Sequence, residues 1–364
     1  MPDNLPNRKL CLVIPSLQAG GMERVMSELI WFFGRKDKIE IHLVLYGKEP
    51  ELFYKIPDSI SIHMPTHVFD NRFRLYSSLS RLIYLRRVIK RIRPHSILSF
   101  GEYWNSFTLL ALAGLNLQIY VSDRCSPAKK FGFFHSQLRH WLYPRATGVI
   151  AQTELARQLY KNQFHNKNVI VIGNPIHEYG EDDSRKDKIV LTIGRLIESK
   201  NHDKIIEVFC EINRPEWKLV IVGGDALKQN NLSKLRDLVY SLGAESKVFL
   251  TGYRTDPGKY YNESSVFVSA STSEGFPNVI GEAMSAGIPV VAFDCISGPS
   301  EMIVDGQNGY LVPVNDYGTL SKRLEQLMDN DSLRNSMGAR ARESIKKYSI
   351  ESIGTKYSDL LLKT

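Results

Sequence analysis

The sequence has 364 residues, 43% of them hydrophobic and 24% charged, with 25 glycines and 16 prolines. These proportions exclude a disordered, collagen-like or disulfide-stapled chain, and the length suggests two domains. The formal net charge is +8, but residues 1–175 carry a balance of +12 and the remainder −4. A basic half can face nucleic acid, anionic lipid or a phosphorylated substrate.

Apolar runs are too short to cross a bilayer, which takes ~20 residues. The polar start of the sequence has no apolar signal segment, so we expect a cytoplasmic protein. The four cysteines, Cys11, Cys125, Cys210 and Cys295, show no C-x-x-C spacing, which argues against a zinc site and a disulfide framework.

Short β-rich apolar runs alternate with helical patterns, beginning with a strand over 10–14 and a helix over 22–33. This alternation predicts βαβ units and a parallel sheet. Further strands are expected over 39–46, 60–64, 96–100, 118–122, 148–151 and 168–172.

The alternation stops near Gly173, and the charged run that follows predicts a linker over 176–188. A second series of strands is expected over 189–193, 218–222, 247–250, 265–269, 289–292 and 309–312. The sequence therefore predicts an α/β fold of two doubly wound Rossmann-like domains, 1–175 and 189–346. A closing helix over 347–364 could cross back to the first domain. Ligands bind at the carboxyl ends of such strands, so two facing sheets would form a cleft.

Two cations follow the first strand of the second half. Arg195 and Lys200 lie five residues apart in a loop that leads into a helix. A guanidinium can hold two phosphate oxygens, and the helix N-terminus adds positive charge, so the loop suits a diphosphate. The alternative is that both are solvated surface charges.

A second pattern runs from Glu274 to Val291. Here a Gly-Phe-Pro turn leads into a helix that begins near Pro277 and ends before Gly287. Glu282 lies inside this small, apolar helix and needs a partner or a ligand there, such as ribose hydroxyls. The alternative is that it is half exposed or pairs with a basic residue.

These motifs resemble the family 4 retaining glycosyltransferases of the GT-B fold. The resemblance covers nearly the whole chain and adds segments 20–24, 222–224, 250–253 and 305–312. It implies that Arg195 and Lys200 hold the donor phosphates and neutralise the leaving nucleoside diphosphate. Glu274 would contact the transferred sugar, and Glu282 the ribose. The other implied donor contacts are Gly275, Phe276, Pro277, Asn278 and Val279 beside the sugar and phosphates, Gly252, Tyr253 and Arg254 near the base, and Gly20 and Gly21 near the diphosphate.

The resemblance implies no metal and no cofactor, because fixed cations and amides can stabilise the leaving diphosphate. The triplet Asp329-Asn330-Asp331 fits the D-x-D pattern of metal-dependent transferases, but its position between two helices favours a helix cap. No metal site is therefore expected.

One segment departs from the family. Many relatives have a histidine on the acceptor side, where this chain has Asp123 and Arg124. An arginine cannot act as a base at neutral pH, which argues against a histidine-dependent role. We assign both residues to the acceptor side; the alternative is a mutual ion pair that orders the loop.

Eight basic residues and no acidic one lie between Asn71 and Pro94, interleaved with aromatic and aliphatic residues. Such a helix suits an anionic lipid surface; the alternative is a helix packed on the sheet with a solvated face. Lys129, Lys130, Phe131, Phe133 and Phe134 form a second basic and aromatic cluster, which suits a membrane or a lipid carrier, or core packing.

Together these features predict a retaining transferase that moves a hexose or N-acetylhexosamine from a UDP-sugar to a lipid-linked glycan at the inner face of the cytoplasmic membrane. One alternative is a sugar-nucleotide epimerase. The other is a non-catalytic sugar- or nucleic-acid-binding protein, but no nucleic-acid-binding motif is found, so nucleic acid is not expected as a partner.

Overall fold

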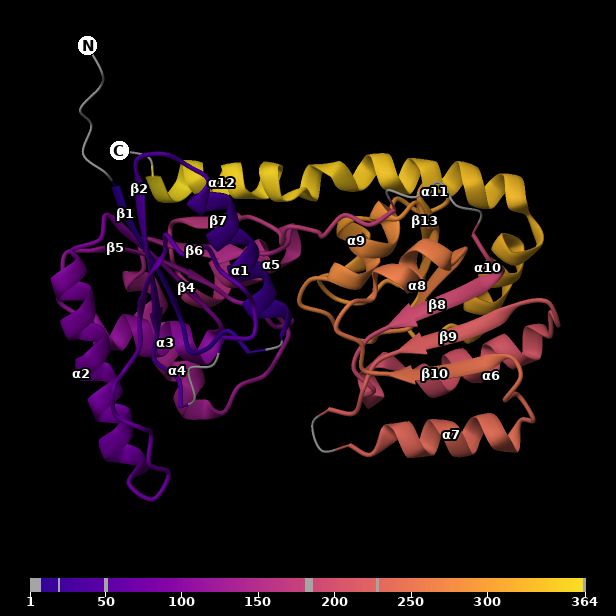
Figure 1. The fold of residues 1–364 in the computed structure, drawn as a ribbon, viewed down its shortest axis with the longest axis horizontal. Helices are drawn as coiled ribbons and strands as arrows, with labels where there is room; N and C mark the ends of the chain where they lie inside the picture. Colours follow the sequence, from indigo (N-terminus) through magenta and orange to yellow (C-terminus); the bar gives the residue numbers. More distant parts are fainter. Residues whose placement is uncertain (1–7, 19, 49–51, 181–185, 227–228, 363–364) are drawn as a thin grey trace, which may run out of the picture. The chain divides into compact units, whose positions relative to one another are not determined.

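The computed structural model describes residues 8–18, 20–48, 52–180, 186–226 and 229–362. The chain divides into two units, Met1–Pro175 with Ile350–Thr364, and Ile176–Ser349. Each unit contains one parallel sheet with helices packed against it (Figure 1). The predicted pair of doubly wound α/β domains is confirmed.

The first unit has a seven-stranded sheet in the order β3-β2-β1-β4-β5-β6-β7. Its strands are β1 (Arg8–Ile14), β2 (Ile39–Leu45), β3 (Ser61–His63), β4 (Ser96–Phe100), β5 (Gln118–Ser122), β6 (Gly148–Ala151) and β7 (Val169–Val171). Its helices are α1 (Gly21–Gly34), α2 (Arg74–Ile92), α3 (Glu102–Ala111), α4 (Phe133–Leu142), α5 (Glu154–Phe164) and α12 (Ile350–Leu362).

The second unit has a six-stranded sheet in the order β10-β9-β8-β11-β12-β13. Its strands are β8 (Ile189–Ile193), β9 (Lys218–Val222), β10 (Val248–Gly252), β11 (Val266–Ser269), β12 (Val290–Phe293) and β13 (Gly309–Val312). Its helices are α6 (His202–Ile212), α7 (Asn231–Ser241), α8 (Gly258–Glu263), α9 (Asn278–Ser285), α10 (Tyr317–Asp329) and α11 (Asp331–Ile345).

The strand order of each sheet reverses direction beside its first strand. β1 lies between β2 and β4, and β8 lies between β9 and β11. The carboxyl ends of β8 and β11 are therefore adjacent, and the loops that follow them start side by side. At such switch points an open α/β sheet binds its ligands.

The first residues of the predicted linker pack on the second unit. The Ile176 amide donates to the Tyr348 carbonyl (2.8 Å), and Tyr179 stacks on Tyr261 with ring centroids 4.8 Å apart. Near the other end, the Asp187 amide donates to the carbonyl of Glu263 (2.8 Å). The polar composition predicted a linker, and these contacts attach both of its described ends to the second unit; residues 181–185 of the predicted linker lie outside the described part.

The closing helix α12 belongs to the first unit and lies beside α1 (Figure 1). Ser96 Oγ in β4 donates to the Leu361 carbonyl (2.7 Å). Gly354 faces the ring of Phe32 so closely that a Cβ there would lie 2.5–2.6 Å from three ring atoms. The helix therefore docks through a contact that only glycine permits.

No helix among the described residues has both the length and the apolar character needed to span a membrane. All four cysteines are unpaired. Asn330 caps α11, because its side chain accepts from the Leu333 amide (2.9 Å), as its position between two helices suggested.

We predict that Gly354→Ala weakens the packing of α12 on α1. The added methyl group overlaps the Phe32 ring, and overpacking of this kind costs about 1–3 kcal/mol. Urea unfolding should show a lower midpoint. The control is Gly318→Ala in α10, where the nearest atom to the added Cβ is 3.7 Å away; an equal loss in both variants would contradict the assigned contact.

Candidate functional site

Three neighbouring strands of the second unit are joined just beyond their carboxyl ends. The Leu196 amide donates to the Gly224 carbonyl (2.9 Å), and the Gly223 amide donates to the Gly252 carbonyl (3.0 Å). A Cβ at Gly223 would lie 1.8 Å from the carbonyl oxygen of Gly194. This close approach fixes the start of the loop that contains Arg195 and Lys200.

The same loop is also fixed to the segment that follows β11. The Thr272 amide donates to the Ser199 carbonyl (2.9 Å). The side-chain amide of Asn201 donates to the Ala270 carbonyl (2.8 Å). Two segments that are about seventy residues apart in sequence are thereby held together at the switch point of the sheet.

This arrangement brings two of the predicted site residues into direct contact. Lys200 Nζ donates to Glu274 Oε1 at 2.5 Å, and the two side chains are only 14% and 12% exposed. The Lys200 side chain runs over Gly194, since a Cβ there would lie 3.6 Å from its Cε. Arg195 is exposed in the same loop. The site therefore combines a paired, half-buried cation with an accessible one.

The loop after β12 covers the other side of Glu274. A Cβ at Gly298 would lie 3.3 Å from Glu274 Cβ and 3.7 Å from Cys295 Sγ. Burial, with the nearby Glu274 carboxylate, raises the pKa of the Cys295 thiol to about 12. The thiol is therefore protonated at neutral pH and acts as a neutral wall of the site.

Helix α9 starts directly beyond this pair. Pro277 precedes its first residue, Asn278, whose amide donates to the Phe276 carbonyl (3.0 Å). The Phe276 ring is buried edge-on against Tyr348, with centroids 5.6 Å apart. Gly275 and Val279 flank this turn. The Asn278 amide is engaged within it, and the contact of these residues with a donor stays a prediction.

Glu282 lies in the middle of α9 and is 1% exposed. Its carboxylate accepts from the Tyr261 hydroxyl (2.8 Å), which also lies near the Val279 carbonyl (3.4 Å). The partner expected from its apolar surroundings thus includes a tyrosine on α8. Its contact with a ribose stays a prediction.

The residues predicted near the base lie at the carboxyl end of β10. Gly252 has a φ of +73°, in the left-handed region that favours glycine. Tyr253 is 61% exposed, and Arg254 Nε donates to the Tyr260 hydroxyl (3.3 Å). An exposed aromatic ring and a cation therefore lie at the end of the strand next to β9.

In the first unit, Gly20 precedes α1 and Gly21 is its first residue. The Gly20 carbonyl accepts from the Tyr54 hydroxyl (3.1 Å), and a Cβ on Gly20 would meet the Glu23 carboxylate at 2.3 Å. Its backbone is extended, so the dihedral angle does not require glycine, and the close carboxylate is the flexible end of a side chain. Their approach to a diphosphate stays a prediction.

Asp123 and Arg124 have separate partners and do not form the ion pair considered above. Asp123 is buried, pairs with Arg139 and accepts from the Tyr143 hydroxyl (2.6 Å). Burial raises the pKa of Asp123 to about 6, although Arg139 lowers it. The Asp123 carboxylate is thus enclosed.

The Arg124 guanidinium stacks on the Phe100 ring at 3.4 Å. It donates to Asn174 Oδ1 (2.5 Å) and to the Tyr357 hydroxyl of α12 (3.0 Å). These contacts make Arg124 a structural clamp within the first unit. Its acceptor-side role stays a prediction.

Helix α2 confirms only part of the predicted basic surface. Arg81 is buried and donates to the His67 carbonyl (2.7 Å), and Arg86 donates to the carbonyls of Ala111 and Ala113 (both 2.9 Å). We call the exposed apolar and basic residues of α2 and of the segment before it the α2 surface. Its basic members are Arg72, Arg74, Arg87, Lys90, Arg91 and Arg93. The apolar members are Val68, Phe73, Leu75, Tyr76, Leu79 and Ile83, between 41% and 90% exposed.

The second basic and aromatic cluster, like the α2 surface, is only partly exposed. Phe131 packs edge-on against Tyr103 and lies under the Arg139 guanidinium (4.6 Å). Phe133 and Phe134 are 72% and 87% exposed at the start of α4. Core packing therefore accounts for Phe131 alone among the three phenylalanines.

The sequence analysis missed His202, the first residue of α6. It is 4% exposed, and neither ring nitrogen has a hydrogen-bond partner among the described residues. Burial, with the charge of Lys200, lowers the pKa of His202 to about 4, against smaller opposing effects of the Arg195 backbone and Asp203. Its position directly after Lys200 and Asn201 could have indicated that His202 lies near the site. Nothing in the spacing of the sequence indicates that its side chain is buried.

The described residues contain no group of three or more His, Cys, Asp or Glu side chains that could hold a metal ion. The chemistry that the arrangement can support is electrostatic: two cations, a carboxylate and a turn with backbone amides at one sheet edge.

Comparison with known proteins agrees with this arrangement. Residues 178–344 match the family model of the glycosyl transferases group 1, and residues 19–178 match that of glycosyltransferase family 4. The fold and this site define a GT-B glycosyltransferase. Because the two matches together span residues 19–344, the chain belongs to glycosyltransferase family 4.

Three similar proteins illustrate the match. The amylovoran biosynthesis glycosyltransferase AmsD of Erwinia amylovora is 28% identical over 97% of this chain and 99% of its own. The N-acetylgalactosamine-N,N'-diacetylbacillosaminyl-diphospho-undecaprenol 4-alpha-N-acetylgalactosaminyltransferase of Campylobacter jejuni is 27% identical over 94% and 96%. A mutant of Staphylococcus aureus TarM, solved with fondaparinux, alpha-GlcNAc-glycerol and UDP, aligns over 78% of this chain and 59% of that one, with 28% identity and a TM-score of 0.67. A second TarM structure aligns over 99% and 100% with 19% identity and a TM-score of 0.80.

We predict that His202 makes the protein sensitive to acid. Its pKa lies below that of an unfolded histidine, so between pH 6.5 and 4 the unfolded chain binds the proton first and stability falls as pH falls. The contribution is on the order of 3 kcal/mol. Urea unfolding at pH 7 and 4.5 should show a smaller loss for His202→Phe than for the parent protein. The control is His177→Phe, an exposed position in the same unit; equal losses in the parent protein and His202→Phe would contradict the prediction.

Proposed function

We propose that the protein transfers a hexose or N-acetylhexosamine from a UDP-sugar to a lipid-linked glycan, with retention of anomeric configuration. The observation that carries the proposal is the contact between Lys200 and Glu274, with Arg195 in the same loop. It is supported by UDP in the TarM mutant structure and by the diphospho-undecaprenol acceptor in the name of the Campylobacter jejuni relative. The context is the assembly of a surface polysaccharide.

The charge on the leaving group determines the mechanism. Cleavage of the bond between the anomeric carbon and the phosphate oxygen leaves negative charge on the diphosphate and positive charge on the sugar. Arg195 and Lys200 stabilise the former, assisted by the positive N-terminal end of α9. The acceptor hydroxyl attacks the anomeric carbon on the face that the diphosphate leaves, and its proton passes to a diphosphate oxygen. No metal ion takes part in this proposal.

Glu274 has two roles in succession. Before the donor binds, it neutralises Lys200, whose side chain is only 14% exposed. When a phosphate takes over Lys200, the carboxylate is released toward the sugar, where it can accept hydroxyl hydrogen bonds or stabilise positive charge. Exchange of one anion for another keeps the half-buried ammonium paired throughout.

The test uses the purified chain with UDP-, GDP- and ADP-sugars and a polyprenyl-diphosphate-linked saccharide. We expect glycosidic product with retained configuration, measured by NMR, and release of UDP that depends on the acceptor. Conversion of the sugar nucleotide without acceptor would indicate an epimerase instead. Absence of transfer and of any thermal stabilisation by UDP would overturn the proposal.

We predict that Lys200→Ala and Arg195→Ala each lower kcat by about 10²–10³, the usual effect of removing one group that stabilises a developing anion. Steady-state kinetics with a fixed acceptor measure this. The matched control is Lys204→Ala in α6, a half-exposed lysine of the same segment whose ammonium pairs with Glu207 (2.7 Å). Unchanged kcat in Lys200→Ala would contradict the role assigned to it.

The proposal includes contact of the α2 surface with an anionic membrane. Exposed aliphatic and aromatic side chains insert among lipid chains, while each nearby basic residue contributes about 1 kcal/mol of attraction. This position would bring a lipid-linked acceptor to the first unit. The exposed Phe133 and Phe134 provide a second apolar contact.

We predict that the double variant Leu75→Asp/Leu79→Asp binds anionic phospholipid vesicles at least tenfold more weakly than the parent protein. Both side chains are exposed, so the fold is retained. Co-sedimentation with vesicles at low and high salt measures the change. The control is Tyr240→Asp/Leu242→Asp, a pair of exposed positions at the end of α7; equal binding by all three proteins would exclude the α2 surface.

A further inference from the structure

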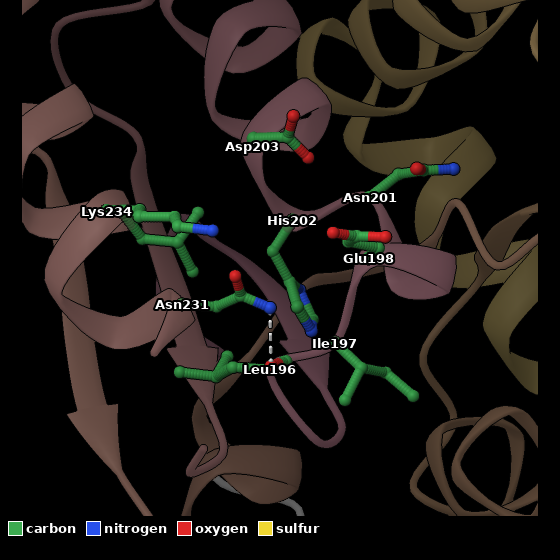
Figure 2. A pocket seen from close by; sticks show the side chains of 9 residues that line it. Leu196, Ile197, Glu198, Asn201, His202, Asp203, Asn231 and Lys234 are labelled. Carbon is green, nitrogen blue, oxygen red and sulfur yellow. Dashed lines mark hydrogen bonds between the residues drawn. The ribbon is translucent and has the colours of Figure 1, made fainter. Parts of the chain in front are cut away.

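Two of the hollows formed by the described residues differ in the charges that line them. The cavity in Figure 2, about 300 Å³ in the second unit, has Glu198 and Asp203 on its walls as well as Lys234, so it favours neither an anion nor a cation. A groove of about 680 Å³ between β3 and α2 in the first unit is lined by arginines and histidines and by no acidic residue. Of the two, only the groove selects a ligand by charge.

The groove runs along one face of α2, opposite β3 and the segment that follows it. From α2 it is lined by residues three or four positions apart, among them Tyr76, Leu79, Ile83, Arg87 and Arg91. The opposite wall lies within residues 62–67. From Tyr76 to Arg91 the helix covers about 22 Å, at about 1.5 Å per residue. The groove is therefore elongated and suits an extended ligand.

Both walls of the groove are fixed within the first unit. β3 pairs with β2, and the His63 imidazole shares a hydrogen bond with that of His42 (3.0 Å). Burial, the neighbouring His42 and the charge of Arg91 lower the pKa of His63, so Arg91 lies at this end of the groove. Toward the start of α2, the buried Arg81 donates to the His67 carbonyl (2.7 Å). The groove is therefore part of the fold and needs no ligand to form.

The groove is apolar toward the start of α2. Tyr76, Leu79 and Ile83 are 75%, 55% and 41% exposed. Ile62 and Met64 add apolar side chains from the opposite wall, 40% and 37% exposed. An aliphatic chain lying along the groove would remove these side chains from water.

The groove is basic toward the end of α2. Arg87 and Arg91 lie one helical turn apart, and neither forms a hydrogen bond or salt bridge within the described part of the chain. Arg81 and Arg86 differ, because they donate to backbone carbonyls. Two guanidinium groups with unused donors suit a phosphate group.

We propose that this groove binds one anionic phospholipid, with its phosphate between Arg87 and Arg91 and an acyl chain along Leu79 and Ile83. The inference rests on the membrane contact in the proposed function and adds a discrete lipid site to the α2 surface. From Arg87 to Tyr76 the groove covers about 16 Å, close to the hydrocarbon thickness of one leaflet, about 15 Å. One acyl chain therefore matches its length.

The experiment uses dihexanoyl-phosphatidylglycerol, a short-chain lipid that stays monomeric, so binding to the groove is separated from binding to a bilayer. The full chain is titrated by isothermal calorimetry without donor or acceptor. We expect saturable one-to-one binding. Dihexanoyl-phosphatidylcholine, which has a cation beside its phosphate, and glycerol 3-phosphate, which has no acyl chain, should each bind about tenfold more weakly.

Two variants locate the phosphate and the chain. Arg87→Gln/Arg91→Gln and Leu79→Ser should each weaken binding about tenfold. The control for charge is Arg35→Gln/Lys161→Gln, two exposed positions of the first unit outside the groove. The control for apolar area is Leu155→Ser on α5, 40% exposed. Both controls should bind as the parent protein does, and circular dichroism verifies the fold of each variant.

Absence of saturable binding, or equal affinity in the parent protein and folded Arg87→Gln/Arg91→Gln, would overturn the lipid site. Tighter binding of geranyl diphosphate than of dihexanoyl-phosphatidylglycerol would also overturn it, because the groove would then suit the diphosphate carrier of the acceptor. Co-sedimentation with anionic vesicles separates this failure from that of the proposed function. A protein that sediments with vesicles but does not bind the monomeric lipid lacks only the groove site, whereas loss of both overturns the membrane contact as well.

Discussion

The close approach of Gly223 to the carbonyl of Gly194 is the constraint on which the candidate site depends. At 1.8 Å, no side chain of any kind fits at position 223, so the loops after β8 and β9 touch through backbone alone. The amide bonds around this contact then fix the direction in which the chain leaves β8. Lys200 reaches Glu274 only because the loop starts from this fixed point.

Two ion pairs in this protein differ in accessibility, and the proposed mechanism depends on that difference. Asp123 and Arg139 are 1% and 3% exposed and are enclosed by aromatic rings, so their exchange for a ligand would leave a buried charge unpaired. Lys200 and Glu274, 14% and 12% exposed, lie at a sheet edge. In the proposed mechanism a phosphate replaces Glu274 there and the ammonium stays paired, an exchange that the enclosed Asp123–Arg139 pair does not permit.

The sequence was sufficient to predict the parallel sheets, the strand ends and the turn from Glu274 to Asn278, because these follow from local patterns and glycine positions. It did not predict the partners of Arg124, since Asn174 and Tyr357 lie 50 and 233 residues away. It also missed the burial of His202 and the packing of Tyr179 on Tyr261, because burial is set by tertiary contacts that polar composition does not reveal.

The positive electrostatic potential at the surface of the first unit is smaller than its formal charge suggests. The guanidinium groups of Arg81 and Arg86 donate hydrogen bonds to backbone carbonyls. Those of Arg124 and Arg139 lie over aromatic rings inside the unit. These cations stabilise the fold and attract little from solution. The cations that remain at the surface of α2 are accompanied by exposed aliphatic and aromatic side chains. Nucleic acid would gain nothing from leucines and isoleucines at such positions, whereas a lipid surface removes them from water, so the mixture of the two kinds of residue favours a membrane.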